Sequence, residues 1–170
     1  ISSTYEKSNV CTGVFIFSNN PNVKMVVENI AYIIAGMLIA FVVYTGIGFL
    51  LSTSEPLVTV VSESMEPTLF RGDMLVLKGI TFDAISTGKE DGDIVVYICP
   101  NSEPKCPDGD KLIVHRVFKK NPDGTLTTWG DNNPAYDRWN VRPEWIKGRM
   151  IIRLPYFGYP RILMSDYLNI

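Results

Sequence analysis

The sequence contains a single histidine, three cysteines and no Cys-x-x-Cys pair. These shortages exclude a histidine-rich metal centre, a zinc finger and a disulfide-rich scaffold. Basic residues do not predominate either: 16 lysines and arginines stand against 18 aspartates and glutamates. The resulting net charge of −2 argues against a nucleic-acid-binding protein. Because 46% of the 170 residues are hydrophobic, an acidic disordered chain is also excluded. We expect no metal, no cofactor and no nucleic-acid partner.

One long apolar run is present near the start of the chain. Residues Ile30–Leu51 form a stretch of 22 residues without any charge. As a helix rising about 1.5 Å per residue, this stretch would cross a bilayer core of about 30 Å. A buried helix of a soluble domain is the alternative. The residues that open the chain lack the basic and apolar regions of a cleavable signal peptide. We therefore expect a flank at 1–29 and a permanent transmembrane helix at 30–51.

The charges that flank this run indicate its orientation. Lys7 and Lys24 precede the run, and the first basic residue after it is Arg71. Basic residues are retained preferentially on the cytoplasmic side of a membrane. We therefore expect the amino terminus in the cytoplasm and the rest of the chain on the extracytoplasmic or lumenal side.

After Leu51, short β-rich runs alternate with turn residues. This spacing is typical of a small antiparallel β-sheet or barrel, so we predict a mainly β domain over residues 52–170. Asn121-Pro-Asp-Gly124 is a hairpin signal between two of the runs. The predicted strands are Leu57–Val61, Met74–Leu77, Ile94–Ile98, Leu112–Phe118, Thr125–Trp129 and Met150–Arg153.

Two residues could form a nucleophile and its base. Ser64 follows a predicted strand, where the backbone would hold an exposed hydroxyl, although serine there is also typical of a helix N-cap. His115 shares one strand face with Ile113 and Val117. It is either an ordinary core residue or the general base that a weak hydroxyl nucleophile requires. Lys78 is the rival base, because it is the first lysine after Ser64.

A histidine base needs a third group on its other ring nitrogen. Asp131 and Asp137 are the candidates, and the alternative for both is an Asx turn that caps a loop. Arg138 could pair with a carboxylate of the site. Elsewhere, Cys99 and Cys106 bracket a short insertion. Outside the membrane they would either close a small disulfide loop or remain independent thiols.

Three segments, in this order, resemble the conserved boxes of type I signal peptidases. They are Val-Ser-Glu-Ser-Met-Glu-Pro-Thr-Leu with Arg-Gly-Asp, then Ile-Val-His-Arg-Val, then Gly-Asp-Asn-Asn with a second aspartate six residues after the first. The resemblance extends from Val58 to about Gly158. Bacterial members have lysine where this chain has His115, so the chain resembles the archaeal and endoplasmic-reticulum branch.

The resemblance implies a membrane-bound serine endopeptidase that removes signal peptides from secretory preproteins. Carried over by position, Ser64 is the nucleophile and His115 the general base. Asp137 is the favoured orienting carboxylate, and Asp131 is a supporting acid or turn former. Ser62 and the backbone N–H of Ser64 would form the oxyanion hole. The chain departs from the family at Glu63, where glycine is usual, so either this turn uses ordinary dihedrals or Ser62 lacks that role.

The implied substrate is a preprotein whose signal helix lies in the bilayer beside residues 30–51. Its cleavage region would bind as an added strand at a sheet edge. No substrate-binding residue can be assigned, although Val58, Val60 and Leu69 are candidates to line the pockets. The sequence leaves open whether further membrane subunits are partners. It also leaves two locations open, an archaeal cell membrane and the endoplasmic reticulum. The Cys-bracketed insertion favours the archaeal membrane by resemblance.

Two alternatives remain at this stage. One is a related serine peptidase that uses a lysine base, as in self-cleaving repressor-type proteins. The other is a non-catalytic, membrane-anchored β-domain subunit of a protein-processing complex.

Overall fold

The computed structural model describes residues 21–103, 105–106 and 111–168, so Cys11 and most of the predicted flank lie outside the described residues. The chain divides into two compact units, residues 1–42 and 43–170. Helix α1 (Pro21–Leu50) provides the described part of the first unit and runs into the second. It begins nine residues before the predicted span, with proline in its first turn, where a missing N–H costs nothing.

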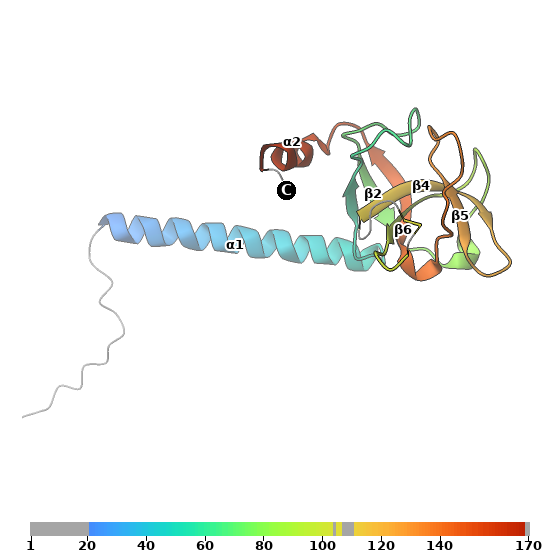
Figure 1. Cartoon of the computed structure of the whole chain (residues 1–170). Helices are drawn as coiled ribbons and strands as arrows, with labels where there is room; N and C mark the ends of the chain where they lie inside the picture. The colour runs from blue at the N-terminus through green and yellow to red at the C-terminus, as the bar shows by residue number, and fades with distance from the viewer. Residues whose placement is uncertain (1–20, 104, 107–110, 169–170) are drawn as a thin grey trace, which may run out of the picture. The chain divides into compact units, whose positions relative to one another are not determined.

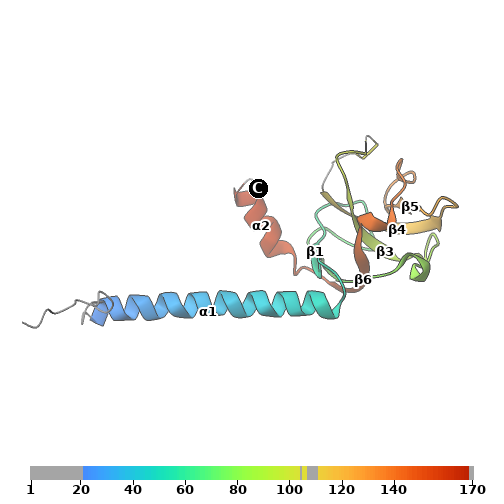
Figure 2. The same ribbon diagram turned by 90° about the horizontal axis from the view of Figure 1, so that it is seen from below.

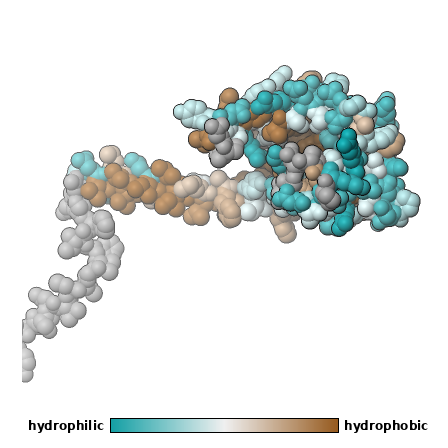
Figure 3. Space-filling model, in the orientation of Figure 1, coloured by the Kyte–Doolittle hydropathy of each residue, from teal (hydrophilic) through white to brown (hydrophobic). Residues whose placement is uncertain are grey.

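Helix α1 is long and apolar enough to cross a membrane, and none of its residues is buried. Apolar side chains cover its visible surface over most of its length, whereas polar residues gather at its amino-terminal end (Figure 3). Lys24 and Glu28 form an ion pair of 3.9 Å in that first part. The charge-free run and the polar start therefore belong to one continuous helix.

The second unit is built on an antiparallel sheet of six strands (Figures 1 and 2). The strands lie in the spatial order β1-β2-β6-β3-β4-β5, and every pairing is antiparallel. The predicted fold class, an apolar amino-terminal helix followed by a mainly β domain, is therefore confirmed. The strands are β1 (Leu57–Thr59), β2 (Met74–Lys78), β3 (Ile94–Cys99), β4 (Lys111–Lys120), β5 (Leu126–Trp129) and β6 (Ile146–Leu154).

The sheet is covered by core on both faces. Along the central strand β3, Ile94 and Val96 pack into one hydrophobic cluster, whereas Val95, Tyr97 and Cys99 pack into the other. Successive side chains of a strand point to opposite faces, so a strand that is buried on both sides carries an unbroken apolar run. This explains why Ile94–Cys99 reads as Ile-Val-Val-Tyr-Ile-Cys rather than as an alternating pattern.

The predicted hairpin joins β4 to β5. The Asn121 N–H donates to the Thr125 carbonyl at 2.8 Å, and Gly124 has a φ of 78°, which glycine adopts without strain. Strand β4 extends past the predicted run at both ends, and β6 begins four residues earlier than predicted.

One α-helix was not predicted. Residues Tyr159–Leu168 form helix α2 at the end of the described chain. The motif Leu154-Pro-Tyr-Phe-Gly158 and Pro160 obscure it in the sequence, because proline usually signals a break. Here Pro160 is in the first turn of the helix, where proline is tolerated.

The two cysteines that bracket the insertion are bonded. Cys99, the last residue of β3, forms a disulfide with Cys106, and their Cα atoms are 6.0 Å apart. Cys106 packs against the same hydrophobic cluster as Tyr97 and Trp139. Of the two alternatives for this pair, the disulfide is the one present.

Candidate active site

A cleft of about 390 Å³ opens between the segment that follows β1 and the first half of β4. Strand β5 pairs with β4 only from Arg116 onward, so Leu112–His115 lie beyond its end and border the cleft. The lining combines apolar and polar side chains: Thr59, Val60, Val61, Ser62, Ser64, Met65, Lys111, Leu112, Ile113, Val114, His115, Asn133, Asp137 and Trp139.

Ser64 lies on a loop whose base and tip are both held by hydrogen bonds. At its base, the Val60 N–H donates to the Asp73 carbonyl and the Gly72 N–H donates to the Val60 carbonyl, both at 2.9 Å. At its tip, the Asn132 N–H donates to the Ser64 carbonyl at 2.8 Å. The Asn132 side chain also donates to the Glu63 carbonyl at 3.1 Å. These bonds join the loop to the segment after β5, so the Ser64 hydroxyl has a defined position.

The glutamate that departs from the family pattern causes no strain in this loop. Among the described residues other than glycine, only Ser52 and Tyr156 have positive φ. Glu63 therefore uses ordinary dihedrals, and its side chain is exposed to solvent. Ser62 Oγ lies 3.3 Å from Ser64 Oγ, so the first serine of the motif faces the same place as the second.

His115 lies between Ser64 and Asp137. Its Nε2 is 3.2 Å from Ser64 Oγ, and its Nδ1 is 2.7 Å from Asp137 Oδ2. Only 7% of the His115 side chain and 4% of the Asp137 side chain are exposed. The structure thus brings together a hydroxyl, an imidazole and a buried carboxylate. This order of contacts can activate a hydroxyl for attack on a carbonyl carbon.

Asp131 lies on the other face of β4 and does not contact the imidazole. Arg116, the neighbour of His115, donates to Asp131 through Nε at 2.9 Å and through Nη2 at 2.6 Å. The Thr68 hydroxyl donates to the same carboxylate at 2.6 Å. Because Thr68 belongs to the Ser64 loop and Arg116 to β4, Asp131 connects the loop to the strand.

The ionised state of Asp131 is stabilised by these donors. Burial raises the pKa of Asp131, but the hydrogen bonds from Arg116 and Thr68 and the Arg116 charge outweigh it. The pKa of this carboxyl therefore lies below its usual value. The hydrogen bond to Asp131 correspondingly raises the pKa of Arg116.

Several sequence-based candidates lie elsewhere. Lys78 is exposed at the end of β2 and does not line the cleft. Arg116, not Arg138, forms the ion pair with an acid of this region. Val60 does line the cleft, but Val58 and Leu69 were wrong as lining residues, because both are buried in the core cluster. Their apolar character did not reveal whether they would face the core or the cleft.

Five residues that contact the site were missed: Thr68, Tyr97, Arg116, Thr128 and Asn132. Arg116 offered a signal, because a charged residue inside an apolar strand usually has a buried partner. Tyr97 and Thr128 offered none, since both are common strand residues.

In the part of the chain that the structure describes, no group of three His, Cys, Asp or Glu side chains could hold a metal ion.

No protein-family model matches the chain. Individual proteins do. The chain is 33% identical, over 82% of its length and 78% of the relative's, to the signal peptidase complex catalytic subunit SEC11 of Schizophyllum commune. It is 34% identical to the human subunit SEC11C, over 83% of this chain and 72% of that one. The corresponding subunit of Neurospora crassa is 36% identical over 75% of this chain and 74% of its own.

The chain belongs to the type I signal peptidase family. The predicted activity, removal of signal peptides by a serine endopeptidase, is confirmed with it, and the non-catalytic alternative is not favoured. These relatives are fungal and mammalian, so they support the endoplasmic-reticulum branch. They give no support to the archaeal assignment.

Gly130 permits the close approach of serine and histidine in this signal peptidase. A Cβ at this position would lie 2.7 Å from the Ser64 carbonyl oxygen and 2.9 Å from His115 Nε2. Gly130→Ala should therefore push the two residues apart and lower kcat by about 10²-fold, as expected for a displacement of this kind. Peptide cleavage and thermal unfolding in detergent measure the effect. Pro134→Ala, at an exposed position in the same loop, is the control, and equal rates for the two variants would contradict the explanation.

The Asp131 carboxylate should stabilise the fold in a pH-dependent manner. Its pKa is lower in the folded than in the unfolded chain, so its contribution is complete above the ordinary value of 3.8 and is lost as pH falls through the folded-state pKa. Asp131→Asn should lower the Tm by about 5 °C at pH 7, because Arg116 loses its ionic partner. The difference in Tm between Asp131→Asn and the unmodified chain should become smaller below pH 4.

The exposed pair of Arg71 and Asp166 supplies the control for that experiment. Asp166→Asn should change the Tm by less than about 1 °C at either pH, because exposed ion pairs contribute little. A Tm difference for Asp131→Asn that stayed constant down to pH 3 would show that ionisation of Asp131 is not involved.

Proposed function

We propose that this signal peptidase cleaves its substrates with Ser64 as nucleophile, His115 as general base and Asp137 as the carboxylate that orients the base. The observation that carries the proposal is the continuous contact from Ser64 Oγ through the imidazole to Asp137 Oδ2. The distance of 3.2 Å between Ser64 Oγ and Nε2 is within the range of a general base and its proton donor. Asp131 supports the fold of the site and takes no proton.

The proposed reaction is acyl transfer. Ser64 Oγ attacks the carbonyl carbon of the residue before the cleavage point, while Nε2 of His115 takes the serine proton. Collapse of the tetrahedral intermediate breaks the C–N bond, and the imidazolium protonates the leaving amine. Water then hydrolyses the Ser64 ester with His115 again as base, which restores the free hydroxyl.

The negative oxygen of the intermediate needs donors that are already in place. The Ser64 N–H is one candidate, since no backbone or side-chain acceptor among the described residues takes a hydrogen bond from it. The hydroxyl of Ser62, which is exposed and 3.3 Å from Ser64 Oγ, is the other. We propose these two groups as the oxyanion hole.

The cleavage region of the substrate binds as an extended strand in this proposal. Leu112–His115 lie beyond the end of β5 and border the cleft, so their backbone can pair with an added strand. Val60 and Leu112 contribute apolar surface beside Ser64. Such a lining suits apolar side chains of the substrate beside the cleavage point.

Helix α1 places the enzyme in the endoplasmic-reticulum membrane in this proposal, with the β domain in the lumen. Two observations support it: α1 is long and apolar enough to span, and the Cys99–Cys106 disulfide requires an oxidising compartment. The relatives are named as subunits of a complex, so further membrane subunits are proposed partners. The substrates are secretory preproteins held in the same bilayer, where tethering raises their effective concentration.

The assignment of roles predicts the effects of single substitutions. Ser64→Ala should lower kcat for a preprotein in detergent by about 10³-fold or more, with Tm preserved. His115→Ala should lower kcat as much, but it should also lower Tm, because it removes a partner of the buried Asp137 carboxylate. Ser62→Ala should lower kcat by about 10²-fold, as for the loss of one oxyanion donor. The measurement is the rate of appearance of the mature protein.

Ser86→Ala removes an exposed hydroxyl that lies outside the cleft, so its rate should equal that of the unmodified enzyme. If Ser64→Ala retained the activity, the assigned nucleophile would be wrong.

The orientation in the membrane can be tested at the β4–β5 hairpin. Asp123 is exposed in the turn and is followed by Gly124 and Thr125, so D123N creates an Asn-Gly-Thr glycosylation acceptor. Synthesised into endoplasmic-reticulum vesicles, D123N should gain one glycan that endoglycosidase removes. The measurement is the shift in electrophoretic mobility.

D123N combined with Thr125→Ala is the matched control, because it lacks the acceptor and should show no shift. Protease added to sealed vesicles provides a second measurement. An unglycosylated D123N whose β domain is digested from outside would place the domain in the cytosol and overturn the proposed orientation.

A further inference from the structure

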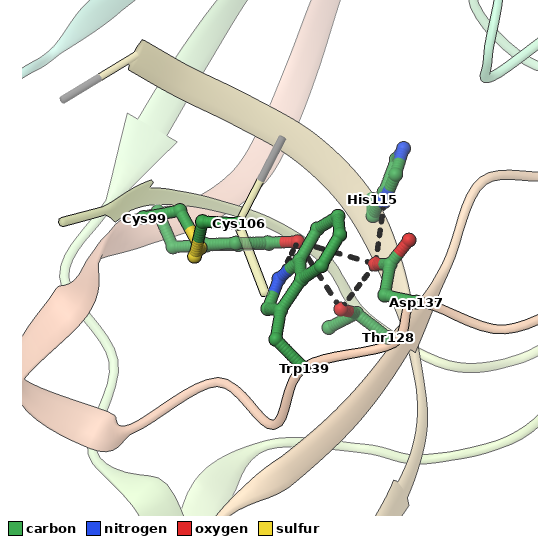
Figure 4. The surroundings of a disulfide bond; sticks show 7 residues. Cys99, Cys106, His115, Thr128, Asp137 and Trp139 are labelled. Carbon is green, nitrogen blue, oxygen red and sulfur yellow. Dashed lines mark hydrogen bonds and ion pairs between the residues drawn. A yellow bond between two sulfur atoms is a disulfide. The ribbon is translucent and has the colours of Figure 1, made fainter. Parts of the chain in front are cut away.

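A buried chain of hydrogen bonds extends from Asp137 through Thr128 and Tyr97 to Trp139 (Figure 4). Thr128 Oγ1 donates to Asp137 Oδ2 at 2.6 Å, and the Tyr97 hydroxyl donates to the same oxygen at 3.2 Å. The indole Nε1–H of Trp139 donates to the Tyr97 hydroxyl at 3.2 Å. Tyr97 and Thr128 have no exposed surface, and Trp139 is 9% exposed.

The number of available protons fixes the direction of these bonds. An indole N–H can only donate, so the Tyr97 oxygen accepts from Trp139. Burial and the nearby charge of Asp137 raise the pKa of Tyr97, so its hydroxyl remains protonated. Its one proton has two acceptors within reach, Asp137 Oδ2 and Thr128 Oγ1, each at 3.2 Å. The Thr128 proton goes to Asp137 Oδ2, so this oxygen receives Thr128 and the His115 Nδ1–H directly, and Tyr97 either directly or through Thr128.

Burying the Tyr97 and Thr128 hydroxyls in a hydrophobic core costs free energy of desolvation. Tyr97 packs with Val95, Cys99, Leu126 and Val141 in the cluster that includes Trp139. Phenylalanine at 97 and valine at 128 would fill nearly the same space with no polar atom to desolvate. The cluster therefore does not need these two hydroxyls for packing, and both of them meet on one carboxylate oxygen.

The donors come from separate parts of the fold. Tyr97 belongs to β3, two residues before the disulfide-bonded Cys99, and Thr128 belongs to β5. The Asp137 N–H also donates to the Thr128 carbonyl at 3.0 Å. The loop that carries Asp137 is thereby held against two strands, although it has no regular structure of its own.

We propose that Tyr97, Thr128 and Trp139 are positioning residues, which hold Asp137 Oδ2 on the line of the His115 Nδ1–H and so direct Nε2 at Ser64. By sharing the carboxylate charge, the two hydroxyls also limit how strongly Asp137 stabilises the imidazolium. Loss of either donor leaves more negative charge facing the imidazole, which strengthens the attraction between Asp137 and the imidazolium. This inference rests on the proposed roles of Ser64, His115 and Asp137.

The test compares Tyr97→Phe and Thr128→Val in the 170-residue chain with its helix α1, singly and together. Each single variant should lower kcat about tenfold, the effect of one hydrogen bond to a charged group, and leave KM within about twofold. The acidic limb of the pH profile of kcat/KM, which reports the free base, should move to higher pH. A purely structural role would lower the amount of folded enzyme without moving this limb.

Two controls match these variants. Thr128→Ser keeps the hydroxyl and should restore the rate and the acidic limb of the unmodified enzyme. Tyr156→Phe removes a hydroxyl from an exposed ring outside the cleft and should change neither. Thermal unfolding of every variant shows whether lower activity follows lost structure.

The outcomes separate this inference from the proposal on which it rests. If Ser64→Ala is inactive but the Tyr97→Phe, Thr128→Val double variant keeps its kcat and its acidic limb, the positioning role is wrong and the nucleophile stands. A loss of activity that only parallels a lower Tm, with the limb unmoved, also overturns it. If Ser64→Ala is active, the proposed function itself fails.

Discussion

The contact between His115 and Asp137 is the constraint on which the arrangement of this protein depends. Both side chains are almost completely removed from solvent. A buried carboxylate is tolerated only when hydrogen-bond donors or a cation contact it. The imidazole, the Thr128 hydroxyl and the Tyr97 hydroxyl supply them. In the proposed mechanism the same contact fixes the tautomer of the base. One hydrogen bond therefore both satisfies the buried carboxylate and orients His115.

The two aspartates of the loop after β5 are distinguished by the alternation of side chains along β4. His115 and Arg116 are neighbours in the sequence and point to opposite faces of the strand. Asp137 meets the imidazole on one face, and Asp131 meets the guanidinium on the other. One acid is therefore available to the proposed base, while the other joins the Ser64 loop to the sheet through Thr68. Their difference in role follows from position, not from residue type.

Much of the fold was predictable because local patterns dominate it. The charge-free run, the six strand segments and the Asn-Pro-Asp-Gly hairpin are expressed in consecutive residues, and the structure contains each of them. The prediction missed α2 because Pro160 hides its first turn, and it misplaced Val58 and Leu69 because an apolar residue does not reveal whether a core or a cleft will receive it. The disulfide was one of two alternatives until the fold brought Cys99 and Cys106 together.

From the sequence alone came the apolar helix, the mainly β class, the family and the set of polar residues from which the site is built. Only the tertiary structure decided that Asp137 and not Asp131 contacts the imidazole, that Arg116 and not Arg138 is the paired cation, and that Tyr97 and Thr128 face the carboxylate. The physical reason is that these contacts join residues up to 40 positions apart, across strands whose register and bulges decide which side chains meet. Hydrophobic patterning specifies that a strand exists, whereas the hydrogen bonds of a buried polar site depend on how several strands are aligned at once.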